Sequence, residues 1–461
     1  MFLSIGRVAG ALSIFARNIV IARLITVEDF GIAATFSITM ALIEMSSALG
    51  VERLIVQATD GNNPRLQATI QSFNVIRGML IALILYAIAG PVANLFDLPE
   101  LTWAYQWLAI VPLVNGFLHM DSARMQRDMV FGPIIWTEEG PKVITLLLTI
   151  PFAHFFPDYR SVLFLVFTQA ISGVVISHVV VRRRYRWAWD RAIFRRIFKF
   201  GWPLILNGLL LFGVFQADRT LVGIAYGMED LGWFSAAFTL TLFPSMVLAN
   251  ICRTYFTPML SKVQNNQQLL QNGAIATIKA CILLGLLLCT GLALAGPPLL
   301  LLLFGDKYAE GAEIIGWLAL MQGLRTVKAG PVIVAIACGR TKLPLYANII
   351  RSLALLIALT AIWQGWGILG VVSGGIIGEA LAVFTILFLL RRTLSINLST
   401  LYGTLLFFAL ATALALILVM KFVTGHNPLP EIAGAAAFCF CALGLFILFS
   451  RDLVRWLARP E

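Results

Sequence analysis

The amino-acid sequence predicts an all-α membrane protein that crosses the bilayer many times. Of its 461 residues, 59% are hydrophobic and only 12% are charged, and the mean hydropathy is +0.88. Soluble globular proteins contain about half apolar and about a quarter charged residues, so this composition excludes a soluble fold. Apolar stretches long enough to span a bilayer recur along the whole chain with short connections between them. They leave no room for a large soluble catalytic domain.

Fourteen apolar windows predict about fourteen transmembrane helices. The windows are residues 3–24, 31–52, 73–96, 102–122, 133–154, 161–181, 202–225, 233–254, 274–296, 312–337, 344–363, 368–390, 401–422 and 430–450. No basic region precedes the first window and no small-residue cleavage site follows it. We therefore expect a retained first helix rather than a signal peptide.

Basic residues are distributed unevenly over the connections between these windows. If the N-terminus is cytoplasmic, nineteen Lys and Arg residues lie on the cytoplasmic side, and only Arg160, Lys307 and Lys421 lie on the outer side. Cytoplasmic loops of membrane proteins carry such an excess of Lys and Arg. We therefore predict that both termini are cytoplasmic. The formal net charge of +11 then reflects orientation, and no nucleic-acid partner is expected.

The longest predicted cytoplasmic connection is basic and aromatic. Residues 182–202 have the sequence RRRYRWAWDRAIFRRIFKFGW. Cations mixed with Trp187, Trp189 and Phe198 are typical of an amphipathic helix in the membrane interface. We predict such a helix, which joins two halves of the chain and anchors their orientation. A site for a specific lipid or partner is the alternative interpretation.

The chain also contains an internal repeat. The segment Ala16–Gly31, ARNIVIARLITVEDFG, matches Ala217–Gly232, ADRTLVGIAYGMEDLG, at an offset of 201 residues. The repeat pairs the first predicted span with the seventh, and six crossings return the chain to its starting side, so the two halves have the same orientation. We predict a six-helix bundle (1–181), a cytoplasmic linker (182–201), a second six-helix bundle (202–392), and two further helices with a cytoplasmic tail (393–461).

Several short motifs together resemble a known family. They are ARLITVEDFG (22–31), GVERLIVQ (50–57), NVIRG (74–78), FDLPEL (96–101), QRDMVF (126–131), FGWPL (200–204), DRTLVG (218–223) and DLGWFSAAF (230–238). This set resembles the Wzx-type polysaccharide-transport family of oligosaccharide-lipid flippases. That family belongs to the multidrug/oligosaccharidyl-lipid/polysaccharide exporter superfamily, and the motifs are most similar to its colanic-acid and teichuronic-acid exporter-like branch. The resemblance covers about residues 1–390.

The resemblance implies both a fold and a function. It implies two six-helix bundles around a central cavity, with two extra helices. It also implies a flippase that moves an isoprenoid-pyrophosphate-linked oligosaccharide repeat unit across the bacterial cytoplasmic (inner) membrane, by alternating access, for lipopolysaccharide or exopolysaccharide biosynthesis. A polysaccharide polymerase and glycosyltransferases of the same pathway would be its protein partners.

Ionisable residues inside the predicted spans are candidate substrate ligands. A charge at the centre of a bilayer costs about 3 kcal/mol, so it usually faces a cavity or a partner. A pyrophosphate loses water as it crosses, and guanidinium groups can replace that water with paired hydrogen bonds, so we expect a cationic cavity. The candidate substrate-binding residues are Arg7, Arg17, Asn18, Arg77, Asp218, Arg219, Arg253, Arg325 and Lys328.

Some of these residues have structural interpretations as well. Arg17 and Asp218 occupy equivalent repeat positions with opposite charges, so an ion pair between the halves is as well motivated as ligand contact. Arg253 lies near a span end and is expected to extend to the interface, and Arg77 is placed to anchor its helix. Arg325 and Lys328 lie far from the ends of their window and favour the cavity. We expect Arg351, near the inner part of its window, to be an interface anchor.

Two carboxylates inside the windows are candidates for binding a coupling ion. Glu44 and Glu379 could each bind a proton or a sodium ion. The membrane potential is an alternative driving force, because each negative charge moved outward gains roughly 2.3 kcal/mol per 100 mV.

No motif indicates an enzyme, a cofactor or a metal. The sequence contains no GxxxxGK[ST], HExxH or GxSxG, and its six cysteines lack metal-ligand spacing. We therefore expect no catalytic residues and no cofactor. Three alternatives remain: a lipid II flippase, a multidrug cation antiporter with a carboxylate-rich cavity, and a polytopic polysaccharide polymerase or ligase, which would need a larger outer loop than the short turns present.

Overall fold

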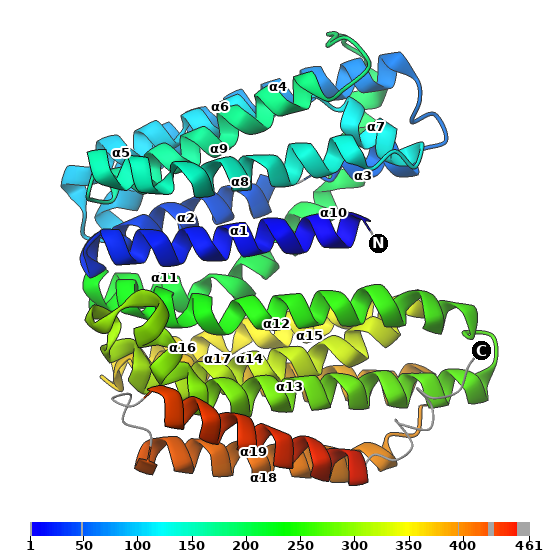
Figure 1. Ribbon diagram of the computed structural model, residues 1–461. Helices are drawn as coiled ribbons and strands as arrows, with labels where there is room; N and C mark the ends of the chain where they lie inside the picture. Colours follow the sequence, from blue (N-terminus) through cyan, green and yellow to red (C-terminus); the bar gives the residue numbers. More distant parts are fainter. Residues whose placement is uncertain (1, 48, 395, 423–427, 450–461) are drawn as a thin grey trace. The chain divides into compact units, whose positions relative to one another are not determined.

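The computed structural model describes residues 2–47, 49–394, 396–422 and 428–449, and the secondary structure in these ranges is helical (Figure 1). Packing divides the chain into two compact units, Met1–Gly232 (unit 1) and Trp233–Glu461 (unit 2). Predictions about the C-terminal tail after residue 449 lie outside the described residues.

Unit 1 is a bundle built around long apolar helices. In it, α8 packs against both α1 and α9, α4 packs against α5 and α6, and α10 packs against α2 and α4. Its helices are α1 (Phe2–Leu24), α2 (Val27–Ser47), α3 (Val51–Gln57), α4 (Pro64–Leu95), α5 (Thr102–Leu108), α6 (Ile110–Asn115), α7 (Asp121–Arg127), α8 (Gly132–Phe155), α9 (Arg160–Val179), α10 (Arg191–Phe215) and α11 (Ala217–Tyr226).

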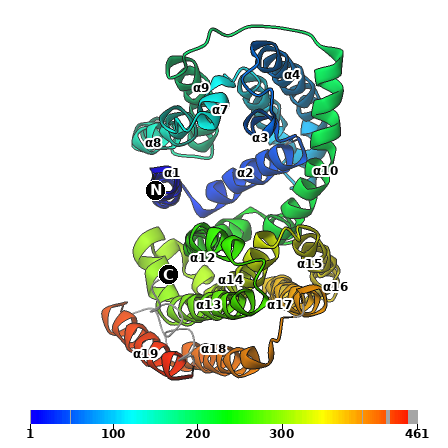
Figure 2. The same cartoon turned by 90° about the vertical axis from the view of Figure 1, so that its right-hand side faces the viewer.

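Unit 2 is organised around α13, which packs against α14 on one side and against α18 and α19 on another (Figure 2). The helix α17 packs against α14, α15 and α16. The helices are α12 (Met228–Lys262), which begins in unit 1, α13 (Gln267–Phe304), α14 (Glu310–Ala337), α15 (Lys342–Leu353), α16 (Leu355–Trp363), α17 (Gly367–Leu394), α18 (Tyr402–Phe422) and α19 (Pro428–Phe449).

The helices confirm a multi-pass, all-α membrane protein. Nine helices in the described ranges are long and apolar enough to cross a bilayer. Each of the fourteen predicted windows also contains a helix, but several of these, such as α1, α8 and α14, carry charged residues inside an otherwise apolar sequence. The number of crossings and their direction therefore remain predictions.

Some predicted spans are interrupted. The window 31–52 ends as a helix at Ser47, and α3 starts after Gly50, whose φ of 62° is a left-handed conformation that favours glycine. The window 102–122 divides at Ala109 into α5 and α6. Pro112 in α6 has no N–H to donate to Leu108, which explains a break in the hydrogen-bond ladder at this place.

The prediction of an amphipathic helix over 182–201 is wrong for its first half. Residues 182–190 form a non-helical connection between α9 and α10, which we call the strap (Figure 2). Helix begins only at Arg191, because the Asp190 side chain accepts hydrogen bonds from the N–H groups of Ala192 and Ile193. From there α10 continues without a break to Phe215. Because α10 packs on α2, it belongs to unit 1.

Buried polar side chains hold the strap in its non-helical form. Asp121, at the start of α7, is fully buried, and its Oδ2 accepts the N–H groups of Arg182 (3.0 Å) and Arg183 (3.1 Å). Its Oδ1 accepts from Arg124 Nε at 2.5 Å. On α4, Ser72 Oγ accepts the N–H of Ala188 at 3.1 Å. Because these acceptors satisfy the backbone of the strap, a helix would gain little there.

The two copies of the repeat meet through equivalent glycines. A Cβ atom on Gly31 would collide with the backbone of Met228, and one on Gly232 would collide with the backbone of Val27. Each copy thus approaches the other through its own glycine, with the backbones in direct contact. This reciprocal packing agrees with the repeat seen in the sequence.

Loss of the Asp121 carboxylate is expected to release the strap. Asp121→Asn should lower the free energy of unfolding by about 2–4 kcal/mol, because charged hydrogen bonds in a buried site are replaced by weaker neutral ones. Limited trypsin digestion of the purified protein measures the release, since four arginines lie at residues 182–186.

Asp128→Asn is the matched control, because Asp128 also pairs with Arg124 but its side chain is 42% exposed. The control should resist trypsin as the wild type does. Wild-type resistance of Asp121→Asn would contradict the anchoring role.

Candidate functional site

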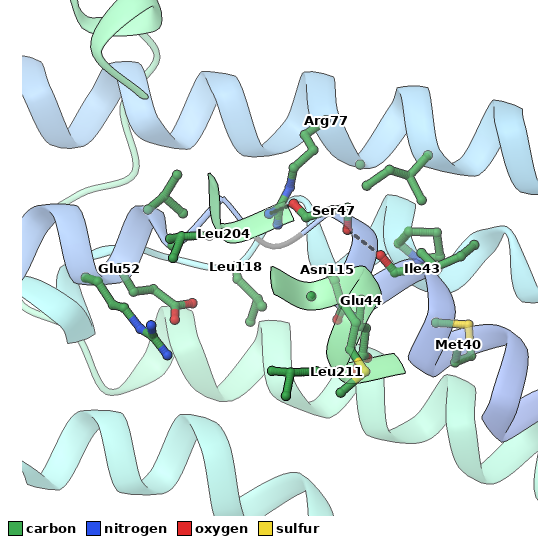
Figure 3. Close-up of a pocket in the computed structure, with 18 of the residues that line it drawn as sticks. Met40, Ile43, Glu44, Ser47, Glu52, Arg77, Asn115, Leu118, Leu204 and Leu211 are labelled. Carbon is green, nitrogen blue, oxygen red and sulfur yellow. Dashed lines mark hydrogen bonds between the residues drawn. The ribbon is translucent and has the colours of Figure 1, made fainter. Parts of the chain in front are cut away.

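Unit 1 contains a polar cavity among its apolar helices. Two adjoining cavities of about 520 Å³ and 310 Å³ share the lining residues Met40, Glu44, Glu52, Asn115 and Leu118. The helices α2, α3, α4, α6 and α10 supply the larger part, which Figure 3 shows. A polar cavity of this size inside a membrane-embedded bundle is large enough to hold a charged headgroup.

Two of the predicted arginines line this cavity. Arg77 extends from α4 towards the end of α2, where its Nη1 donates to the carbonyl oxygen of Ser47 at 3.1 Å (Figure 3). Arg17, on α1, donates from Nη1 to Gln169 Oε1 at 3.0 Å and to Thr145 Oγ1 at 3.4 Å. Among the described residues, Arg17 makes no ion pair with Asp218. The acceptors of both arginines are neutral groups. Within the part of the chain that the structure describes, neither guanidinium is therefore in direct contact with a carboxylate that would balance its positive charge.

The cavity also contains acidic residues, two of which the sequence analysis did not identify. Glu44 of α2 is a predicted residue, whereas Glu52 of α3 and Glu138 of α8 were not predicted. A signal existed for Glu138, because Glu138 and Glu139 are adjacent carboxylates inside the apolar window 133–154. With Arg53 included, three arginines and three glutamates line the two cavities. The lining of these two cavities therefore carries both signs of charge, whereas the sequence predicts a cationic cavity.

The remaining candidates in unit 1 do not line the cavity themselves, although Arg7 contacts a residue that does. Arg7 is exposed and forms a long ion pair of 3.9 Å with Glu138, and Asn18 is half-buried. Asp218 is buried on α11, and Arg219 beside it donates to Gln216 Oε1 at 3.4 Å.

In unit 2, Arg325 and Lys328 come together around the second predicted carboxylate. Arg325 Nε lies 3.0 Å from Glu379 Oε1, and Lys328 Nζ lies 2.6 Å from Glu379 Oε2. Glu379 is fully buried, and the two cations are less than a tenth exposed. Arg325 and Lys328 are three residues apart on α14, whereas their partner on α17 is 54 residues from Arg325. Arg253, on α12, is exposed.

Arg351 completes this cluster, and its prediction as an interface anchor is wrong. The residue is fully buried, with Nε 3.3 Å from Glu379 Oε1. The long side chain fits because α17 presents glycine at this point, and a Cβ on Gly378 would lie 2.8 Å from Arg351 Cδ. The sequence contains a signal for this contact, because Gly370, Gly374 and Gly378 recur every four residues, a spacing that lets another helix pack closely.

The cluster concentrates positive charge in a buried place. With all four groups ionised, three cations surround one carboxylate, which leaves a net charge of about +2. The cations stabilise the ionised form of Glu379 and oppose binding of a further cation such as sodium. Glu379 is therefore placed to hold α14, α15 and α17 together.

Comparison with known proteins confirms the resemblance. The family described as "Polysaccharide biosynthesis protein" matches residues 20–313, more than half of the chain. The amylovoran biosynthesis protein AmsL of Erwinia amylovora is 23% identical over 64% of this chain and 77% of its own length. The lipopolysaccharide biosynthesis protein WzxC of Escherichia coli is 20% identical over 77% of this chain and 72% of its own.

Solved structures with the same fold are membrane transporters. The structure of the lipid II flippase MurJ matches with a TM-score of 0.76 at 15% identity, covering 98% of this chain and 100% of that chain. A multidrug-resistance transporter of the MOP superfamily matches with a TM-score of 0.71 at 16% identity, covering 84% and 94%. At these identities the likeness shows the fold. The family match shows that the chain belongs to the polysaccharide biosynthesis protein family.

Proposed function

We propose that this protein is a flippase that moves an isoprenoid-pyrophosphate-linked oligosaccharide repeat unit across the bacterial inner membrane, without chemically changing it. The observation that carries the proposal is the charged cavity within the apolar helices of unit 1, in a chain whose family is concerned with polysaccharide biosynthesis. Fourteen crossings with both termini in the cytoplasm, and alternating access between two bundles, complete the proposed topology and mechanism.

Arg17 and Arg77 are the proposed ligands of the pyrophosphate. Each holds its guanidinium in the cavity through neutral acceptors, so donor groups remain for a second, anionic partner. The glutamates in the same cavity repel that anion when ionised, and they therefore favour its release once the site opens to water. A cavity with both signs of charge can in this way bind a polyanion without trapping it.

The mixed lining also bears on the rival function. A multidrug cation antiporter would need carboxylates in excess of cations, whereas arginines and glutamates are equal in number in the lining of the two cavities. The names of the relatives, from amylovoran and lipopolysaccharide biosynthesis, support the oligosaccharide-lipid substrate over a drug. They also support a pathway in which glycosyltransferases load the lipid and a polymerase consumes it.

Glu44 is the proposed site of ion coupling. It lies in the cavity of unit 1 and makes no ion pair within the described ranges, whereas Glu379 is surrounded by cations. A carboxylate with access to a polar cavity can exchange a proton or sodium ion, and one enclosed by three cations is poorly placed to do so.

Cells depleted of the protein should accumulate a complete repeat unit on isoprenoid pyrophosphate in the cytoplasmic leaflet. Wild type should clear it, and Arg77→Ala should restore export about tenfold less well, because a bidentate anion contact is lost. Mass analysis of lipid extracts measures the unit, with Lys199→Ala, an exposed cation, as control. A unit accumulated on the outer leaflet would indicate a polymerase or ligase. No accumulation, with altered sensitivity to cationic drugs, would indicate the antiporter.

Transport in reconstituted vesicles should depend on the membrane potential. Two negative charges moved outward gain about 4.6 kcal/mol at 100 mV, so setting the potential to zero should slow transport at least tenfold. The measurement is uptake of a fluorescent isoprenoid-pyrophosphate saccharide, with and without an ionophore. Unchanged uptake at zero potential would refute this driving force, and loss of uptake in Glu44→Gln would then assign coupling to that residue.

Glu379→Gln should destabilise unit 2 by about 3–5 kcal/mol, because three buried cations lose their carboxylate. Thermal unfolding in detergent should show a lower midpoint, and adding Lys328→Met should recover part of the loss by removing one cation. Glu313→Gln, an exposed change on α14, is the control. If Glu379→Gln were as stable as this control yet inactive in transport, Glu379 would be a coupling site rather than a structural one.

A further inference from the structure

A second polar pocket lies on unit 1, separate from the proposed substrate cavity. It has a volume of about 380 Å³ and shares no lining residue with the cavity. Its lining consists of residues from the first turns of α4 and three of the four arginines of the strap: Pro64, Gln67, Ala68, Gln71, Arg183, Arg184 and Arg186. Every polar side chain in this set is an arginine or an amide, and none is acidic.

The wall of this pocket is fixed in place. The N–H of Arg186 donates to Gln71 Oε1 at 3.4 Å, and the two N–H groups held by Asp121 fix the preceding part of the strap. The guanidinium of Arg183 is itself positioned, because its Nη1 donates to the carbonyl of Asn62 at 3.0 Å and to Gln67 Oε1 at 3.1 Å. The arginines therefore project from a pinned backbone rather than from a free loop.

The positive charge of this pocket is not cancelled by the acids near it. Asp121 pairs with Arg124 at 2.5 Å, Asp190 pairs with Arg65 at 3.1 Å, and Asp60 pairs with Arg196 at 2.9 Å. Each neighbouring carboxylate is thus already bound to a cation outside the pocket. Within the described ranges, the three arginines that line the pocket form no ion pair. Three arginines that line one pocket without a carboxylate form a site for an anion with several oxygens.

The surroundings indicate that this anion is carried by a lipid. Trp187 and Trp189 follow the arginines directly, and their side chains are 59% and 66% exposed. Farther along, Phe198 and Trp202 on α10 are also exposed. Exposed tryptophans beside cations are typical of a surface that lies at the level of lipid headgroups. A phosphate at that depth could enter the pocket while its acyl or isoprenoid chains stay in the bilayer.

We propose that this pocket binds the phosphate-bearing headgroup of a lipid in the adjacent leaflet. The ligand chemistry is a phosphate diester or a pyrophosphate, which an anionic phospholipid or an isoprenoid pyrophosphate would each supply. Arg184 and Arg186 are exposed and free to close on the oxygens, and Arg183 forms the fixed side of the site. Binding here does not require that the protein transport anything.

The test is equilibrium lipid binding to the purified full chain in detergent, followed by native mass spectrometry. The probes are phosphatidylglycerol, farnesyl pyrophosphate and, as a zwitterionic reference, phosphatidylcholine. The pocket variant is Arg184→Gln with Arg186→Gln, because neither side chain makes a structural hydrogen bond within the described ranges. We expect this variant to bind one or both anionic probes about 30-fold more weakly than wild type, since each cation near the membrane surface contributes about fivefold.

The matched control is Arg191→Gln with Arg195→Gln, which removes the same charge from exposed positions on α10. The control should bind both anionic probes within about threefold of wild type. A loss confined to phosphatidylglycerol would identify a phospholipid ligand, and a loss confined to farnesyl pyrophosphate would identify the isoprenoid pyrophosphate. Equal weakening in both double variants, or no weakening in the pocket variant, would overturn the proposal. Because the assay involves no transport, its failure would leave the proposed flippase function standing.

Discussion

Every charge placed among membrane-spanning helices needs a partner or access to water, and this constraint organises both units. Unit 1 satisfies this constraint with a polar cavity. In it, Arg17 and Arg77 donate hydrogen bonds to neutral acceptors, and Glu44 lines the open space. Unit 2 meets it by burial, where Glu379 collects three cations into one network. The first arrangement leaves binding capacity for a ligand, whereas the second uses that capacity to hold helices together.

Close backbone approach is the second device on which the fold depends. Gly31 and Gly232 bring the two copies of the repeat into direct contact, and Gly378 makes room for Arg351 against α17. Helices in a bilayer gain little from hydrophobic association, since lipid is as apolar as their side chains. Small residues at the contacts, and a few strong polar interactions, therefore decide which helices pack together. The Asp121 site performs the same task at the end of the bundle, where it fixes an irregular segment.

The proposed function follows from these physical parts taken together. A lipid-linked pyrophosphate oligosaccharide presents a compact polyanion on an apolar tail, so a carrier needs cations in a polar cavity and a surface that tolerates the tail in the bilayer. Unit 1 has both, with the arginines of its cavity and a separate group of arginines on the strap beside exposed tryptophans. The family and the relatives agree with such a substrate. Carboxylates in the same cavity would limit how tightly the anion is held.

The sequence by itself determined the membrane class, the helical windows, the repeat and the family, because hydropathy, periodicity and short motifs are properties of local segments. It also identified Arg17, Arg77, Glu44, Arg325 and Lys328 as unusual, since a charge inside an apolar window is visible without a fold. Only the tertiary structure decided what each of them contacts. Glu379 lies 54 residues from Arg325, and Asp121 lies 61 residues from Arg182. Pairings over such separations depend on how helices pack. For the same reason the strap is not helical, although its composition favours an amphipathic helix.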